Sequence, residues 1–105
     1  DLKQKKCVPC EGGALPMERI EAEKFAAMVN GWAIVSGQIE KEFTFKDFKA
    51  AMQFINKVAA VAEEEGHHPD IFLHGWNKVK ITLSTHAIGG LSMNDIILAA
   101  KINYV

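Results

Sequence analysis

The sequence predicts a single two-layer α+β domain in which helices pack against an antiparallel sheet. Two observations predict this fold class. Segments with helical periodicity alternate along the chain with short strand-like segments, and elements of both kinds need one another to bury their apolar faces. The chain also has 105 residues, of which 49% are hydrophobic and 24% charged, which suits one globular core.

Composition and charge narrow the function classes. The formal net charge is -1, so nothing predicts binding to nucleic acid or to an anionic membrane surface. No apolar run is long enough to span a bilayer, and the polar, basic N-terminus has no apolar signal core. We therefore expect no membrane association and a cytoplasmic location, with the nucleus or an organelle as alternatives.

Residues 1–13 are polar and contain Pro9 and two glycines, which predicts an extended or partly mobile arm before a domain over residues 14–105. Cys7 and Cys10 lie in this arm. Three readings stay open for them: an ordinary segment, a structural contact or occasional disulfide, and a metal or redox site. Neighbouring lysines are expected to lower the thiol pKa.

The first predicted helix runs from Pro16, which suits a first helical turn, to Val29, and Asn30-Gly31 ends it. A hairpin follows, with strands over 32–35 and 39–45 and a turn between them. Lys41 interrupts the apolar face of the second strand, so we expect at least one exposed edge.

The longest predicted element is a helix from about Phe45 to Glu65. Thr44-Phe45-Lys46-Asp47 resembles a capping box at its start, and Gly66 is the expected stop. Its apolar stripe follows a 3.6-residue period and comprises Phe48, Ala51, Met52, Ile55, Val58, Ala59 and Ala62.

The last third of the chain predicts further strands and a final helix. Residues 71–73 are a short apolar run, and residues 76–83 alternate like a half-buried strand. A glycine-pair turn precedes a second capping box over 92–95, which opens a helix running towards Tyr104. The order is helix, two strands, helix, one or two strands, helix.

Three histidines are the main chemical candidates. His67 and His68 follow the end of the long helix, and His86 follows a strand, so all three lie in loops on rigid supports. Imidazoles exchange protons near neutral pH and can act as acid and base. Surface or capping histidines remain the alternative. A metal site is disfavoured, because neighbouring residues of an extended chain point to opposite sides.

Other candidates have structural explanations. Asp95 is explained as the acidic member of a capping box, and Glu63 with the two glutamates after it as a solvated helix face. His74 is expected to be exposed in a loop. Trp32 and Trp76 are core or pocket-wall residues.

The order and spacing of these residues resemble one family signature. Glu63-x3-His67-His68-Pro69, followed at fixed distances by Trp76, His86 and Asp95, is similar to the pterin-4a-carbinolamine dehydratases. The resemblance covers about residues 15–103. It implies three helices packed on one face of a four-stranded antiparallel sheet, in the order α-β-β-α-β-β-α, with residues 71–74 as a strand.

The resemblance also implies an activity and a site. The reaction is dehydration of 4a-hydroxytetrahydrobiopterin to quinonoid dihydropterin and water, a hydro-lyase step of tetrahydrobiopterin recycling that needs no metal or organic cofactor. His67 and His86 match the acid/base positions, and His68 matches a position that holds the substrate and shares in proton transfer. Asp95 is expected to orient His86. Positions at or near the substrate are matched by Glu63, Trp32, Pro69 and Asp95.

Family members also suggest a homodimer or homotetramer. Two alternative functions stay open: a non-catalytic dimerisation or interaction module with the same fold, and pterin handling in molybdenum cofactor metabolism. The segment from Pro69 to Trp76 is one residue longer than in animal members, so we expect the loop near residues 71–75 to have a different shape. The cysteine arm is not part of this signature. The signature also does not report the transcription-factor binding of animal members, so we do not expect that function from it.

Overall fold

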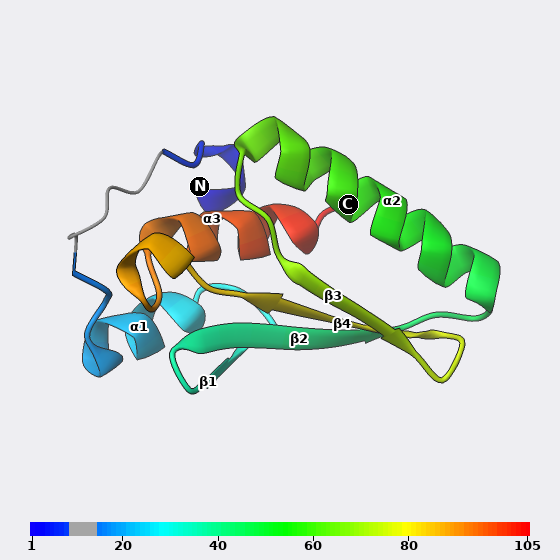
Figure 1. Ribbon diagram of the computed structural model, residues 1–105, viewed down its shortest axis with the longest axis horizontal. Coiled ribbons are helices and arrows are strands. Elements are labelled where there is room, and N and C mark those ends of the chain that lie inside the picture. The colour runs from blue at the N-terminus through cyan, green and yellow to red at the C-terminus, as the bar shows by residue number, and fades with distance from the viewer. Residues whose placement is uncertain (9–14) are drawn as a thin grey trace.

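The computed structural model describes residues 1–8 and 15–105. Three helices lie on one face of a four-stranded antiparallel sheet, in the order α-β-β-α-β-β-α, so the predicted fold class is confirmed (Figure 1). The helices are α1 (Arg19–Ala26), α2 (Phe48–Glu65) and α3 (Met93–Ile102). The strands are β1 (Ala33–Val35), β2 (Gln38–Thr44), β3 (Asp70–His74) and β4 (Lys78–Leu83). Two short 3-10 helices are η1 (Leu2–Gln4) and η2 (His86–Ile88).

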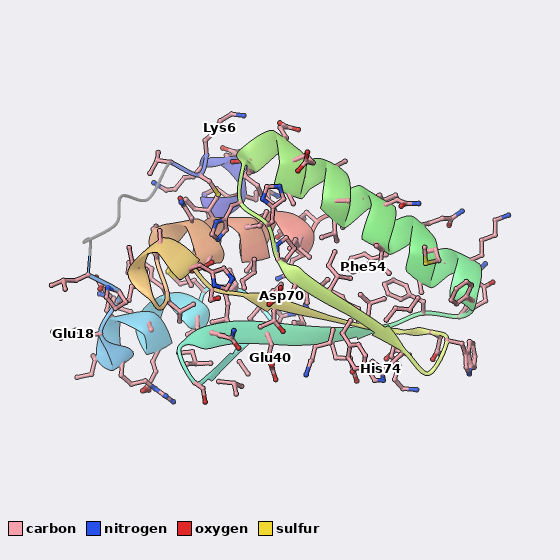
Figure 2. The ribbon with its side chains drawn as sticks, viewed as in Figure 1. Lys6, Glu18, Glu40, Phe54, Asp70 and His74 are labelled. Carbon is pink, nitrogen blue, oxygen red and sulfur yellow. The ribbon has the colours of Figure 1, made fainter. Side chains whose placement is uncertain are left out.

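The sheet has the strand order β1-β2-β4-β3, with every neighbouring pair antiparallel. Alternate residues of β4 are fully buried, namely Val79, Ile81 and Leu83, and buried residues of all three helices belong to the same core. Figure 2 shows Phe54 between α2 and the sheet, and His74 on the other side of the sheet. The period-two pattern of β4 thus sets which face the helices cover.

The first helix is shorter than predicted. It begins at Arg19 rather than near Pro16, because the N–H of Met17 donates to the carbonyl of Leu91 at 2.9 Å and holds that segment extended. It ends at Ala26, and Trp32 precedes β1 instead of beginning it.

The start of α2 also differs from the prediction. Asp47 is itself the N-cap, and its carboxylate accepts the N–H of Ala50 at 2.7 Å, so Thr44 does not open a capping box. Thr44 is the last residue of β2, and the N–H of Phe45 donates to Asn77 in the β3–β4 turn. Because Phe45 pairs with the sheet side of the molecule, α2 begins at Phe48, three residues later than predicted.

The buried stripe of α2 is close to the predicted one. Val58, Ala51 and Ala62 are buried as expected, but Phe54 is buried and was not predicted, whereas Phe48 is 52% exposed and Ala59 is also exposed. The aromatic ring of Phe54 packs against Phe43 and Phe45, with centroids 4.6 and 4.9 Å away.

Lys41 lies on the helix-facing side of β2, where the sequence shows a break in the apolar pattern. Its ammonium donates to Asn103 Oδ1 at 2.8 Å and to the carbonyl of Asn30 at 2.9 Å. Burial lowers the pKa of Lys41 below its usual range. The charge is thus satisfied by Asn103, which follows α3, and by the loop after α1. β2 is an inner strand, and the edges of the sheet are β1 and β3.

The N-terminal residues pack onto the helices. η1 contacts α3, and Lys101 Nζ of α3 donates to the carbonyl of Lys3 at 2.9 Å. Residues 1–8 are therefore docked on the helical layer, and the predicted boundary at residues 13 and 14 lies outside the described residues. Among the described residues, no helix has the length and apolar character needed to cross a membrane.

Candidate active site

The end of α2 positions two of the histidines. Gly66 adopts a left-handed conformation with φ 65°, and its N–H donates to the Glu63 carbonyl while the N–H of His67 donates to the Ala62 carbonyl at 3.2 Å. This pair of bonds is a Schellman motif, which reverses the chain direction within two residues. His67 and His68 consequently leave the helix at a defined angle before β3.

A short closed loop positions the third histidine. After β4, Thr85 and Gly90 pair with each other, the Thr85 N–H donating to the Gly90 carbonyl at 2.8 Å. The single turn η2 lies inside this loop, and His86 is its first residue, with an exposed side chain. The loop therefore presents His86 from a rigid support.

The three histidines line one cavity of about 390 Å³. They come from the α2–β3 connection and from the loop after β4, which the fold brings together. The described lining residues are Cys7, Val8, Glu65, Gly66, His67, His68, Ser84, Thr85, His86, Ala87 and Asn94. Another cavity, of about 470 Å³, lies beside Lys41 and Asn103 and has no histidine in its lining.

Asp95 is the buried carboxylate of the site. It is fully buried, and its Oδ1 lies 2.6 Å from Nε2 of His67. Its Oδ2 accepts the Thr85 hydroxyl at 2.8 Å and the Ser92 N–H at 3.0 Å, which confirms the predicted capping box of α3. Asp95 thus serves the helix and a histidine at once.

The histidine that Asp95 holds is His67, not His86 as the sequence led us to expect. Asp95 lies in the first turn of α3, α3 packs against α2, and the imidazole that contacts Asp95 is that of His67, which directly follows the C-cap of α2. His86 is exposed and lines the cavity from the loop after β4. A carboxylate only accepts hydrogen bonds, so a contact with ionised Asp95 selects a form of His67 that carries a proton on Nε2.

His68 has a more exposed setting. Its ring nitrogen Nε2 pairs with Glu63 of the last α2 turns, and the two side chains are 61% and 77% exposed. Solvent weakens such a pair, so Glu63 orients His68 only loosely. Pro69 is half-buried between His68 and β3 but is not among the residues that line the cavity.

The structure does not bring Trp32 and Trp76 to the histidine cavity. Trp32 is buried, donates its indole N–H to Asn103 Oδ1 at 3.0 Å and packs edge-on against Phe43. Trp76 lies in the β3–β4 turn, at the far end of β3 from His68, and is 61% exposed. A role of Trp32 in substrate binding stays a prediction.

His74 is placed differently from the expected loop. It is the last residue of β3, its ring nitrogen pairs with Glu42 on β2, and its imidazole stacks on Phe72 with centroids 4.8 Å apart. It belongs to the sheet face opposite the helices and takes no part in the cavity.

The sequence did not indicate Glu65 as a residue of the cavity, and its side chain was expected to be solvated like that of Glu64. Its side chain is only 3% exposed, and its Oε1 accepts the N–H of Cys7 at 2.8 Å. This hydrogen bond, with Lys101 and Lys6 nearby, lowers the pKa of Glu65 although burial opposes the shift. Its position directly before Gly66 and three residues after the buried Ala62, on the edge of the apolar stripe, was the available signal.

Cys7 also lines the cavity, and its acidity is opposite to the expectation. Burial is the main cause that raises the pKa of Cys7 to about 11, and the Glu65 carboxylate is the second. Together they outweigh the opposite effect of Lys101. The thiol is therefore protonated at neutral pH. Cys10 lies outside the described residues. No cluster of three or more histidine, cysteine or acidic side chains suited to a metal ion occurs within residues 1–8 and 15–105.

Comparison with known proteins gives a consistent family. Residues 15–105 match the family described as pterin 4 alpha carbinolamine dehydratase. A Nitrosomonas eutropha protein with a provisional pterin-4-alpha-carbinolamine dehydratase name is 44% identical over 98% of this chain and 91% of its own. The mitochondrial pterin-4-alpha-carbinolamine dehydratase 2 of Arabidopsis thaliana is 46% identical over 98% of this chain and 58% of its own.

Two solved structures are also similar. The transcriptional coactivator/pterin dehydratase of Brucella melitensis has a TM-score of 0.80 and 34% identity, covering 85% of this chain and 96% of its own. A pterin dehydratase-like RuBisCO assembly factor of the alpha-carboxysome has a TM-score of 0.57 and 26% identity, covering 70% and 83%. On the family match and the identity to its relatives, this chain belongs to the pterin 4 alpha carbinolamine dehydratase family.

Proposed function

We propose that this protein dehydrates a 4a-hydroxytetrahydropterin, such as 4a-hydroxytetrahydrobiopterin, to the quinonoid dihydropterin and water. The observation that carries the proposal is that three imidazoles line one cavity, and that the least exposed of them is held by the buried Asp95. The cavity volume of about 390 Å³ lies in the range of small-molecule sites. Membership of the family supports the same reaction.

The chemistry needs an acid and a base near each other. The C4a–O bond breaks, the hydroxyl group takes up a proton and leaves as water, and a ring nitrogen of the pterin loses a proton. Hydroxide is a poor leaving group unless it is protonated, so the acid lowers the barrier to C–O cleavage. The protons gained and lost balance, and the reaction consumes no electrons.

The histidines can supply both functions. We assign His67 and His86 as the acid/base pair, and His68 as the residue that holds the substrate near its hydroxyl and shares in proton transfer. Asp95 acts through His67 by fixing the orientation and tautomer of its ring. The other binding positions we propose are Glu63, beside His68, together with Pro69 and Trp32.

The test is the rate of quinonoid dihydropterin formation by the purified protein. We expect His67→Ala and His86→Ala each to lower kcat on the order of 10²-fold or more, because each removes one proton-transfer group. His74→Ala is the matched control, since His74 is a hydrogen-bonded histidine on the opposite sheet face. It should retain the activity of the parent protein.

Two outcomes would count against the proposal. A parent protein that does not accelerate dehydration contradicts the proposed reaction. An active parent whose His67→Ala and His86→Ala variants keep full activity contradicts the assignment of these two residues. Circular dichroism of each variant shows whether a loss of activity reflects unfolding.

The same site suits two physiological settings. We favour tetrahydrobiopterin recycling after aromatic amino acid hydroxylation, in the cytoplasm, and keep pterin handling in molybdenum cofactor metabolism as the alternative. An organelle is the other location we consider, because the Arabidopsis relative is named as mitochondrial.

A second candidate function is a dimerisation or interaction module, alone or beside catalysis. The similarity to a pterin dehydratase-like RuBisCO assembly factor favours it, since that protein is named for assembly. The edge strands β1 and β3 offer backbone groups to another chain. We expect a homodimer or homotetramer by light scattering, and a monomer at all concentrations would argue against this candidate.

A further inference from the structure

We propose that Cys7 and Val8, from the N-terminal segment, form one wall of the substrate site and set the affinity for the pterin. This inference rests on the proposed function, because it assigns the histidine cavity to the pterin. Both residues line that cavity together with the three histidines. They lie before residue 15, where the family match begins.

The backbone of Val8 is held by a side chain of α3. Its N–H donates to Asn94 Oδ1 at 2.9 Å, and the amide nitrogen of Asn94 donates back to the Val8 carbonyl. Two hydrogen bonds to one buried amide fix both the position and the direction of this residue. Asn94 directly precedes Asp95, so the same turn of α3 holds the wall and the catalytic histidine.

Cys7 is held from α2 as well as from α3. Its N–H donates to Glu65 at 2.8 Å, and its Sγ lies 3.6 Å from the carbonyl oxygen of Asn94. The thiol keeps its proton near neutral pH, because the Cys7 pKa is raised to about 11. It therefore offers the cavity a small, uncharged and weakly polar surface, which suits the face of a pterin ring.

Residues before Cys7 anchor the wall to the domain. The carbonyl of Lys3 accepts Lys101 Nζ at 2.9 Å, and the Lys3 ammonium lies 3.9 Å from the centre of the Tyr104 ring. Lys6 lies beside the end of α2, within 3.7 Å of Glu64 (Figure 2). The wall is thus attached on both sides of Cys7, as expected of a fixed part of the site.

A wall of this kind affects binding rather than proton transfer. Neither side chain is a base or an acid at neutral pH, so both should contact substrate and transition state about equally. Losing such contacts raises KM and leaves kcat unchanged. Loss of a histidine lowers kcat instead, so the two roles are kinetically separable.

Alkylation of Cys7 tests the inference without relying on turnover. In a Cys10→Ser background Cys7 is the single thiol, and its reaction with N-ethylmaleimide is measured with and without 7,8-dihydrobiopterin. At about ten times the Kd, about one tenth of the sites stay empty, so we expect about tenfold slower alkylation. Calorimetry on the same protein supplies the Kd.

The control places the thiol elsewhere on the same segment. The variant Cys7→Ser, Cys10→Ser, Lys5→Cys carries it at an exposed position outside the cavity lining, and its alkylation should not respond to the pterin. Binding of the pterin without protection of Cys7 overturns the inference alone. No pterin binding to the parent protein overturns the proposed function and the inference with it.

Two deletions provide a kinetic readout. Removing residues 1–8 should raise KM about tenfold at unchanged kcat, which corresponds to about 1.4 kcal/mol of binding free energy. Removing residues 1–4 takes away η1 and the Lys3 contacts but keeps the hydrogen bonds that hold Cys7 and Val8 directly to Glu65 and Asn94. It should therefore leave KM within about twofold. Equal KM values for the two deletions contradict the inference.

Discussion

At the scale of single residues, Asp95 connects the fold to the site. One of its oxygens accepts the N–H of Ser92 and the hydroxyl of Thr85, and the other faces His67. A buried carboxylate with a partner on each oxygen is fixed in its rotamer. The cap of α3 therefore gives His67 a rigid partner, so the stability of the helix start and the orientation of His67 depend on the same side chain.

Substituting Asp95 in two ways separates these roles. Asp95→Asn keeps an oxygen for Ser92 and Thr85 but turns an N–H donor towards His67, which forces the other imidazole tautomer. We expect kcat to fall on the order of 10²-fold with little loss of stability. Asp95→Ala also loses the cap and leaves the Thr85 hydroxyl without its acceptor, which should lower the unfolding free energy by about 2 kcal/mol.

Chemical denaturation and steady-state kinetics on the two variants provide the comparison. If Asp95→Asn keeps the full kcat, orientation of His67 by the carboxylate is not needed for the reaction. If both variants are equally destabilised, the cap and the histidine contact cannot be separated in this way.

At the scale of elements, the end of α2 sets the direction of the histidine segment. Gly66 provides the left-handed residue that lets two backbone bonds close on the last helical turn, and His67 is the next residue. Most residues with a Cβ are strained in that conformation, whereas asparagine tolerates it better than the others. The position of His67 thus depends on the left-handed backbone of Gly66, a residue that has no side chain to make contacts.

We predict that Gly66→Ala lowers the unfolding free energy by about 1 kcal/mol. For a domain of this size that corresponds to a Tm shift of about 4–8 °C. Gly66→Asn is the matched control and should lose less than half as much. Thermal unfolding by circular dichroism measures both, and equal losses would show that the left-handed conformation is not the cause.

At the scale of the whole molecule, Glu65 joins three parts of the chain that are distant in sequence. It ends α2, accepts a hydrogen bond from Cys7, and lies 3.6 Å from Lys101 of α3 and 3.9 Å from Lys6. These contacts lower its pKa below the usual 4.5. The docked N-terminal segment is consequently stabilised by the ionised form of Glu65.

The sign of this shift sets a pH dependence. A carboxyl group whose folded-state pKa is lowered stabilises the fold above its unfolded pKa, and this contribution is lost as pH falls through the folded value. We expect Glu65→Gln to lower the unfolding free energy by about 1 kcal/mol at pH 7, with the difference shrinking at acidic pH. Glu64→Gln, at a side chain 70% exposed, should change stability little.

Denaturant unfolding of the parent protein and both variants between pH 7 and pH 3 measures the effect. A difference for Glu65→Gln that stays constant over this range would contradict the role of the ionised carboxylate. A large effect of Glu64→Gln would instead show that the charge balance of the helix end matters more than the Cys7 contact.

The sequence by itself determined the features that depend on neighbouring residues. The fold class, the stop at Gly66 and the capping box of Ser92 and Asp95 follow from patterns within a few residues, and the structure confirms them. His67, His68 and His86 were selected from spacing and family resemblance, and the structure places them around one cavity. Their catalytic roles stay predictions.

Only the tertiary structure decided which distant side chains meet. His67 is 28 residues from Asp95, and Val8 is 86 residues from Asn94, so no local pattern encodes either contact. They depend on how α3 packs against α2 and on how the N-terminal segment docks on both helices, which the packing of the whole domain sets. The same packing directs Asp95 to His67 instead of His86, keeps Trp32 away from the histidine cavity, and brings Cys7 to its wall.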